Sequence, residues 1–312
     1  MRFKALLLSL SLALTVNLVG CSKDNVKTED KAKVTLVLST GGVNDQSFNQ
    51  SAWEGALKAS EELGVEVSYL ESNSDADYMQ NIETAIDQDS DLVVGVGFQV
   101  GDAIKEASKA YPDQQFVTID SENENLDNVR AITFSEKEAG YLVGLIAGKM
   151  TKTNVISCIG GFDIPSLSPF FEGYEEGAKE ANPNIKILKQ YINSFTDASK
   201  GKVVAQQMIN KDADIIFMAT GGGNIGIIEA INEVDNVKGI GVDMPMAYLS
   251  ENIITSALKN VGEGLKLTIK DYVEGNFTNG EVKYDLANGG VGYEKTDLIP
   301  SDIVEYVEGK IK

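Results

Sequence analysis

The chain alternates between short apolar runs and longer segments in which apolar residues recur every three or four positions. Short apolar runs are typical of buried strands, and the wider spacing is typical of amphipathic helices. In the first part of the chain the expected strands are 34–38, 65–70, 92–96, 116–119 and 131–133. Three helices are expected between them. The first begins at Gln46 or Ser47, the second spans 76–88, and the third runs through Ala103 and Ala107. This repeated strand–helix order favours a parallel sheet of the doubly wound type.

The same alternation starts again in the second part of the chain. The expected helices there are 139–150, 168–181, 203–209 and 225–234. The expected strands are 155–159, 185–191, 215–218 and 240–242. Two such blocks, each of about 100 residues or more, predict an α/β protein with two doubly wound lobes. A further strand at 253–258 and a helix at 261–272 fit either lobe.

The N-terminus predicts a cleaved leader and a lipid anchor. Arg2 and Lys4 precede an apolar run at 5–19, which is shorter than the roughly 20 residues that span a bilayer. The run leads into Leu-Val-Gly-Cys21, which resembles the cleavage box of bacterial lipoproteins. We therefore expect a signal peptide at 1–20, lipid on Cys21, a flexible tether at 21–32, and a lipid-anchored location on the extracytoplasmic face of the cell membrane.

Charge and cysteine content narrow the partners of the chain. Without residues 1–20 it carries 25 basic and 47 acidic side chains, a net charge of −22. Such a surface repels phosphate backbones, so we expect no nucleic-acid partner. With Cys21 lipidated, Cys158 has no partner for a disulfide within the chain, and its apolar surroundings favour a buried thiol.

The sequence contains no histidine. Ser–His and Cys–His nucleophile pairs are therefore excluded, and the commonest protein ligand of transition metals is missing. Carboxylate and lysine chemistry remain open. The expectation is a binding protein rather than an enzyme, with no catalytic residue, metal site or cofactor.

Several motifs, in matching order between about Lys33 and Tyr272, resemble the basic membrane protein family. They are GGVNDQSFNQSAWEG at 41–55, GGFDIP at 160–165, SFTD at 194–197 with KGK at 200–202, and IITSALK at 253–259. The family comprises substrate-binding lipoproteins of ABC importers, and its characterised members bind purine nucleosides. The resemblance implies a nucleoside ligand, an ABC permease as partner, and a monomer.

The resemblance also implies the periplasmic-binding-protein type I fold, in which two Rossmann-like lobes are joined by a three-segment hinge and the ligand lies in the cleft. The implied N-terminal lobe is 33–133 plus 259–288, and the implied C-terminal lobe is 134–258 plus 289–312. This fold brings the strand-end loops of both lobes face to face.

Two phenylalanines match family positions that stack on the nucleobase. Phe48 is expected to be exposed with Asn49 in the first turn of the first helix, and Phe195 follows a strand in the second lobe. Asn49 matches a polar position beside the stacking ring, where an amide can both donate and accept hydrogen bonds. From the residues alone, Phe48 fits a core position equally well, and Phe195 could simply pack its loop.

Other matching positions lie at strand ends. Asp120 is in the family's place for an acidic ligand contact, and Asp243 and Lys259 match a pair that binds the ribose. Without a ligand, Asp243 and Lys259 would also serve as an ordinary ion pair. Gly222 matches a backbone contact with the ligand, whereas Phe170 could line the pocket or be buried.

Ser39 departs from the family pattern, because the family commonly carries an aspartate there that meets the edge of the base. Serine keeps a donor and an acceptor but not the charge, so the base preference does not carry over. A sugar- or other small-molecule-binding receptor or adhesin, not coupled to import, remains the alternative function.

Other classes fit the sequence less well. The glycine-rich segment at 95–101 reads GxGxxxG rather than the GxGxxG of dinucleotide sites, and no GK[ST] follows the glycines at 221–223. A nucleoside hydrolase would need an N-terminal DxDxxxDD motif, and a repressor would need a helix-turn-helix head; the sequence shows neither.

Overall fold

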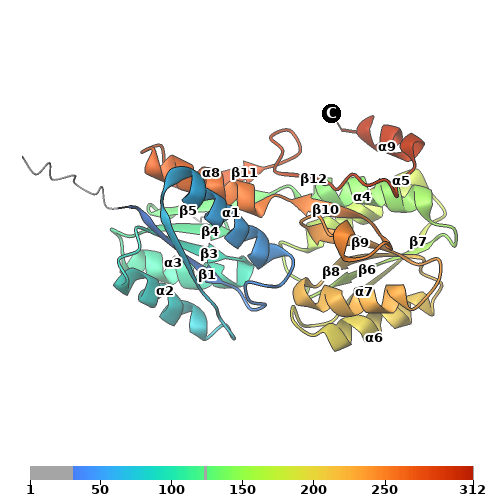
Figure 1. Ribbon diagram of the computed structural model, residues 1–312, viewed down its shortest axis with the longest axis horizontal. Coiled ribbons are helices and arrows are strands. Elements are labelled where there is room, and N and C mark those ends of the chain that lie inside the picture. Colours follow the sequence, from blue (N-terminus) through green and yellow to red (C-terminus); the bar gives the residue numbers. More distant parts are fainter. Residues whose placement is uncertain (1–30, 123–124, 312) are drawn as a thin grey trace, which may run out of the picture. The chain divides into compact units, whose positions relative to one another are not determined.

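The computed structural model describes residues 31–122 and 125–311. The expected signal peptide and the lipidation site at Cys21 therefore lie outside the described residues. The described chain forms two sheets in which parallel pairing dominates, each with helices on both faces (Figure 1). The predicted fold class is confirmed.

The first sheet has the strand order β11-β5-β4-β3-β1-β2, and all of its neighbouring strands are parallel. Its strands are β1 (Lys33–Leu38), β2 (Glu66–Leu70), β3 (Leu92–Val96), β4 (Gln115–Ile119), β5 (Val129–Phe134) and β11 (Gly280–Tyr284). Its helices are α1 (Phe48–Leu63) and α8 (Val261–Val273) on one face, and α2 (Asp77–Asp87) and α3 (Gly101–Ala110) on the other (Figure 1). Covered on both sides, the central strands are almost continuously apolar.

The second sheet has the order β12-β10-β9-β8-β6-β7, and only its edge strand β12 is antiparallel. Its strands are β6 (Val155–Gly160), β7 (Lys186–Tyr191), β8 (Ile215–Ala219), β9 (Lys238–Asp243), β10 (Ile253–Lys259) and β12 (Val291–Tyr293). The accompanying helices are α4 (Glu136–Met150), α5 (Ser168–Ala181), α6 (Ala198–Ile209), α7 (Asn224–Asn232) and α9 (Ser301–Glu308). Short 3-10 turns follow three strands, at η1 (Phe98–Val100), η2 (Gly221–Gly223) and η3 (Ala247–Leu249).

Within the described residues the chain passes between the two sheets at three places, which are β5 to α4, β10 to α8, and β11 to β12. Hydrogen bonds join these crossovers side by side. The amide of Ser135 donates to the carbonyl of Tyr284 at 2.8 Å, and the amide of Asn260 donates to the carbonyl of Gly290 at 2.9 Å. The amide of Leu286 donates to the Glu138 carboxylate at 2.9 Å.

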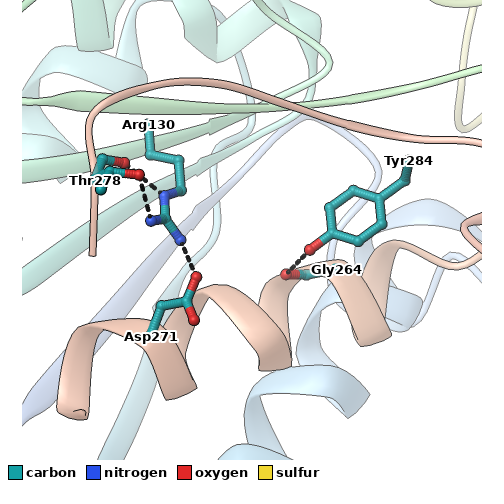
Figure 2. Close-up of polar contacts among 5 residues, drawn as sticks. All are labelled: Arg130, Gly264, Asp271, Thr278 and Tyr284. Atoms are coloured by element: carbon teal, nitrogen blue, oxygen red, sulfur yellow. Dashed lines mark hydrogen bonds and ion pairs between the residues drawn. The ribbon is translucent and has the colours of Figure 1, made fainter. Parts of the chain in front are cut away.

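A buried arginine holds α8 and the segment that follows it against the first sheet. Arg130 of β5 is 2% exposed and donates hydrogen bonds to Asp271 of α8 at 2.7 Å and to the carbonyl of Thr278 at 2.7 Å (Figure 2). Its guanidinium also lies over the ring of Phe277, 4.3 Å from the centroid. Because a buried guanidinium needs partners for its donors, these contacts set where α8 and the strand after it lie.

Several boundaries differ from the expected ones for local reasons. Helix α6 begins at Ala198, five residues before the expected start, because the Asp197 side chain caps it by accepting from the amide of Lys200. The first turn is polar there and carries no apolar signal. The segments β11, β12 and α9 were not expected at all; β11 has alternating, half-exposed residues, and β12 is very short.

Candidate functional site

A cavity of about 630 Å³, counted to its open mouth, lies between the carboxyl ends of strands from the two sheets. One wall comes from the loop and helix after β1, from the turn after β3, and from the end of β4. The facing wall comes from the α5 entry, the loop after β7, and the ends of β8, β9 and β10.

The first wall is organised by Asp45. Its carboxylate accepts hydrogen bonds from the backbone amides of Ser47, Asn49 and Gln50, at 2.9 to 3.1 Å. These are among the amides that a helix start leaves without intrahelical partners, so Asp45 stabilises the beginning of α1. Helix α1 consequently begins at Phe48, one or two residues later than expected.

Phe48 is half-buried and lines the cavity, whereas Asn49 is only 2% exposed. The expectation that Asn49 is exposed was wrong, because its side chain turns toward β1. Its amide oxygen accepts a hydrogen bond from the Ser39 hydroxyl at 3.1 Å, and its amide nitrogen donates to the Ser39 carbonyl at 3.3 Å. The two side chains hold each other in place along one edge of the cavity.

Phe195 lines the cavity from the other wall and is half-buried. Its ring packs beside that of Phe162, with a centroid distance of 5.2 Å and a tilt of 57°. A Cβ atom on Gly161 would come within 2.2 Å of the Phe195 ring, so this glycine gives the ring its place. The ring therefore packs its own loop and also faces the cavity.

Lys259 is the most enclosed charged group of the site, with its side chain 2% exposed. Its ammonium lies 2.6 Å from Oδ2 of Asp120 and 2.8 Å from Oε1 of Glu136. Burial lowers the pKa of this lysine, but the neighbouring carboxylates of Asp120, Glu136 and Asp243 outweigh burial and raise it above its ordinary value. Lys259 is therefore a fixed positive charge at neutral pH.

Asp120 follows β4 in a left-handed backbone conformation, with φ of 68°. Burial raises its pKa to about 7, against the lowering effect of Lys259 and with a further raising effect of Glu136. Its Oδ1 is buried and finds no hydrogen-bond partner among the described residues. A buried acceptor without a partner is costly, and a donor on a ligand would remove that cost.

Asp243 ends β9, also with a left-handed backbone, at φ of 65°. Burial raises its pKa to about 6, while Lys259 and the Ser47 hydroxyl, which donates to its Oδ2, act in the opposite direction. The alternative expectation for the ligand-free protein, an ordinary ion pair between Asp243 and Lys259, was wrong. In the described part of the chain, the ammonium is paired with Asp120 and Glu136, which lie closer to it.

Phe170 and Gly222, which were also expected at the site, differ in whether they line the cavity. Phe170 is 2% exposed and packs edge-on against Phe217 with centroids 6.2 Å apart, yet it also lines the cavity, so both alternatives apply. Gly222 does not line the cavity, whereas the preceding Gly221 does. The left-handed φ of 56° at Gly221 turns the loop after β8 toward the cavity at that residue.

Sequence reasoning missed some residues of the site. Ser47 and Phe98 line the cavity, and Glu136 contacts Lys259 from behind. Ser47 lies inside the motif at 41–55, so its position carried a signal. Nothing in the sequence indicated that Glu136, 123 positions away, would meet Lys259.

Comparison with known proteins gives a consistent picture. Residues 32–312 match the family model described as ABC transporter substrate-binding protein PnrA-like. The chain is 36% identical to the ABC transporter nucleoside-binding protein BmpA of Lactococcus lactis subsp. cremoris, over 97% of this chain and 96% of that protein. It is 37% identical to basic membrane protein A of Borreliella burgdorferi, over 92% of this chain and 86% of that protein.

Solved structures agree on the architecture. A solute-binding protein of an ABC transporter system from Aeropyrum pernix K1 superposes with a TM-score of 0.80 at 29% identity, covering 89% of this chain and 85% of that one. The arabinose-binding protein AraP of Geobacillus stearothermophilus has a TM-score of 0.65 at 17% identity, covering 86% and 98% of the two chains, and shows the fold alone.

The two-sheet fold with a cavity at the strand ends defines a solute-binding protein of the periplasmic-binding-protein type I class. Within this class the chain belongs to the Bmp family of PnrA-like ABC transporter substrate-binding proteins, which confirms the resemblance seen in its motifs. Members of this family are binding proteins rather than enzymes, and ABC substrate-binding proteins act outside the cytoplasm.

In the part of the chain that the structure describes, no helix is both long enough and apolar enough to cross a membrane. The same described residues contain no group of histidine, cysteine, aspartate and glutamate side chains arranged to hold a metal ion.

Proposed function

We propose that this protein captures a nucleoside in the cavity between its two sheets and delivers it to the permease of an ABC importer. One observation carries the proposal: Phe48 and Phe195 line the same cavity as the charged group of Lys259, Asp120 and Asp243. Flat rings beside fixed hydrogen-bonding groups suit a ligand with an aromatic base and a hydroxylated sugar. The Lactococcus lactis relative, named a nucleoside-binding protein, supports the same ligand class.

The base would lie against Phe48 and Phe195, one ring from each wall. Base–aromatic stacking contributes about 1–3 kcal/mol per base. A base that stacks on a ring from each wall would therefore stabilise the arrangement in which the two lobes close over the ligand. The Ser39 and Asn49 pair would meet the edge of the base with neutral donors and acceptors.

The sugar would meet charged groups. Asp243 accepts from ribose hydroxyls, and the Lys259 ammonium donates to a hydroxyl oxygen. Asp120 accepts an N–H or O–H of the ligand through its unpartnered Oδ1. Together with backbone and ring contacts, the proposed ligand-binding residues are Ser39, Phe48, Asn49, Asp120, Phe170, Phe195, Asp243 and Lys259, with Gly221 in place of Gly222 as the backbone contact.

We propose a preference for purine nucleosides, because the larger purine ring offers more surface for stacking on two phenylalanines. A neutral hydroxyl at Ser39 discriminates less between base edges than a carboxylate would. A comparison of purine with pyrimidine nucleosides therefore tests this preference. We also propose that Cys21 carries a lipid, that the lobes are 33–133 plus 259–288 and 134–258 plus 289–312, and that the protein acts as a monomer.

Calorimetric titration of the soluble form that begins at Ser22 tests the ligand class. The panel is adenosine, guanosine, inosine, uridine and cytidine, with ribose, arabinose and glucose as the sugar arm. We expect binding of one or more nucleosides, with purines tighter than pyrimidines, and no heat from the sugars. Binding of a sugar with no response to any nucleoside would overturn the proposal in favour of a sugar receptor.

A further inference from the structure

Glu136 occupies a special place between the two sheets. It is the first residue of α4, directly after the crossover from β5, and its side chain is only 9% exposed. Its Oε1 lies 2.8 Å from the ammonium of Lys259, which ends β10 at another crossover. The contact therefore joins two of the segments that connect the sheets.

Glu136 contacts the Lys259 ammonium without lining the ligand cavity. Lys259 and Asp120 line that cavity, whereas Glu136 does not. Glu136 instead lines a second cavity, and Asp120 lines both. The ammonium is thus paired with one carboxylate outside the ligand cavity, Glu136, and with one that lines both cavities, Asp120.

The contacts within the described residues leave one N–H group of the Lys259 ammonium free to donate to a ligand. An ammonium has three N–H groups, and among the described residues its hydrogen-bond partners are the carboxylates of Asp120 and Glu136. The rings of Phe48 and Phe134 lie 5.2 and 5.1 Å from the ammonium and keep it out of water. A desolvated ammonium needs a carboxylate partner at all times.

Asp120 alone would be a poor sole partner for this lysine. Its Oδ1 is already without a donor, and a ligand that donates to Asp120 draws on the same carboxylate that neutralises Lys259. Glu136 lies outside the ligand cavity and faces no such competition. The second carboxylate therefore keeps the ammonium paired while the first one turns to the ligand.

We propose that Glu136 is a positioning residue for ligand binding: it holds the Lys259 ammonium from behind, so that Lys259 can donate to the ligand and Asp120 can accept from it. The proposal rests on the function proposed above and adds a residue that does not itself touch the ligand.

The charges around Asp120 give the proposal a distinctive pH signature. The groups that face it are Lys259 of β10, Glu136 of α4 and Asp243 at the end of β9, and Asp45 faces Asp243 in turn. Glu136 is one of the causes that hold the Asp120 pKa near 7. An ionised Asp120 accepts from the ligand, so affinity should rise with pH through this value and level off above it.

The other charged side chains that line the second cavity are Asp102, Lys105, Glu122, Glu281 and Lys283, a mixture of both signs.

Calorimetric titrations of the soluble protein from about pH 5.5 to pH 8.5 test the role of Glu136. The probe is whichever of adenosine, guanosine, inosine, uridine and cytidine binds the wild type most tightly. Glu136→Gln should weaken binding on the order of tenfold above pH 8, and the midpoint of its pH profile should move below that of the wild type. Glu136→Asp keeps the charge, so it should keep the wild-type midpoint and lose less affinity.

Glu138→Gln is the matched control. Both glutamates lie in the first turn of α4, so both changes remove the same favourable charge from the helix start, but Glu138 contacts the amide of Leu286 and not Lys259. The control should keep the wild-type affinity and midpoint. Equal effects of the two glutamine variants, or a Glu136→Gln profile that overlays the wild type, would overturn the proposal.

The outcomes separate the two proposals. If the wild type binds none of the nucleosides, the proposed function fails; if it binds and the Glu136 variants behave as wild type, only the role of Glu136 fails. Should Glu136→Gln not fold, Glu136→Asp decides alone, because its shorter side chain withdraws the carboxylate from Lys259. Undiminished affinity in that variant contradicts the proposal.

Discussion

The hydroxyl of Ser47 donates a hydrogen bond to Oδ2 of Asp243, which lies 196 residues further along the chain. Ser47 precedes α1 on the first wall of the cavity, and Asp243 ends β9 on the facing wall. Both residues are nearly fully buried. The two walls are thus joined at the ligand cavity by a side-chain contact as well as by the crossovers.

Ser47→Ala should speed the release of the ligand. The change removes a hydrogen bond between the walls and also a group that lowers the Asp243 pKa, so Asp243 becomes a weaker acceptor near neutral pH. A hydrogen bond to a charged group contributes about 1.5–3 kcal/mol, and we expect dissociation about tenfold faster. Surface plasmon resonance with the tightest-binding nucleoside measures the rate.

Ser60→Ala is the control for this experiment. Ser60 donates to the carbonyl of Val65 at 2.8 Å, near the far end of α1 and away from the cavity. Its dissociation rate should equal that of the wild type. A Ser47→Ala variant that releases the ligand no faster than this control would show that the contact between the walls plays no part in retention.

Phe48→Ala and Phe195→Ala should each weaken nucleoside binding more than they weaken the fold. Both rings are half-buried at the cavity, and the loss of one stacking partner corresponds to about 1–3 kcal/mol, or roughly 5- to 150-fold in the dissociation constant. Calorimetry gives the affinity, and urea unfolding without ligand gives the stability.

Phe170→Ala provides the contrast, because its ring is 2% exposed and packs on Phe217. Truncating a buried phenylalanine costs about 3–5 kcal/mol of folding free energy. If Phe48→Ala lowers the stability of the ligand-free protein to the same extent and leaves the affinity unchanged, Phe48 is a core residue and not a stacking one.

Most strands of this fold could be predicted from the sequence because they are buried on both faces. Runs such as 92–96 are apolar throughout and match β3, whose residues are all buried. Strand β11 shows the limit: Gly280–Tyr284 alternates between half-exposed and exposed positions and pairs only with β5, so its apolar signal is weak. Its place depends on the long-range contacts of Arg130, which no local pattern reveals.

Several residues of the site could be predicted from the sequence for a related reason. Parallel strands bring their carboxyl ends to one edge, so residues that end strands, such as Ser39, Asp120 and Asp243, could be expected to meet. The partners of each charge could not be predicted, because they depend on the relative placement of the two sheets. That is why the sequence suggested only Asp243 as an ion-pair partner of Lys259 in the ligand-free protein, while the structure pairs Lys259 with Asp120 and Glu136.

Arg130→Met should destabilise the protein by about 3 kcal/mol. The substitution keeps the apolar stem but removes the hydrogen bonds to Asp271 and to Thr278 that hold α8 and β11 against β5 (Figure 2). Urea unfolding of the soluble form measures the loss. The control is Lys137→Met, which removes an ion pair with Glu176 whose two side chains are both more than half exposed, and it should leave the stability almost unchanged.

Nearly equal destabilisation by the Arg130 and Lys137 variants would contradict the structural role of the buried arginine. A loss confined to Arg130→Met, accompanied by an unchanged nucleoside affinity at temperatures where the variant is folded, would place its effect on the fold and not on the site.

Asp243→Asn should stabilise the ligand-free protein at high pH although it weakens ligand binding. Burial raises the pKa of Asp243 to about 6, above the ordinary value of 3.8, so ionisation is harder in the folded chain than in the unfolded one. Below pH 3.8 the carboxyl is neutral in both states and has no effect. As pH rises from 3.8 to 6 the unfolded chain ionises first, and the folded state loses stability until the effect becomes constant above pH 6.

Asparagine carries no charge and can still accept from Ser47, so the variant should gain on the order of 2 kcal/mol relative to wild type at pH 8 and much less at pH 4. Urea unfolding of both proteins at the two pH values measures the difference. An equal gain at both pH values would mean that side-chain shape and not ionisation is responsible. A loss of stability at pH 8 would mean that the ionised Asp243 stabilises the fold through Lys259 more than its burial opposes it, and the raised pKa would then be wrong.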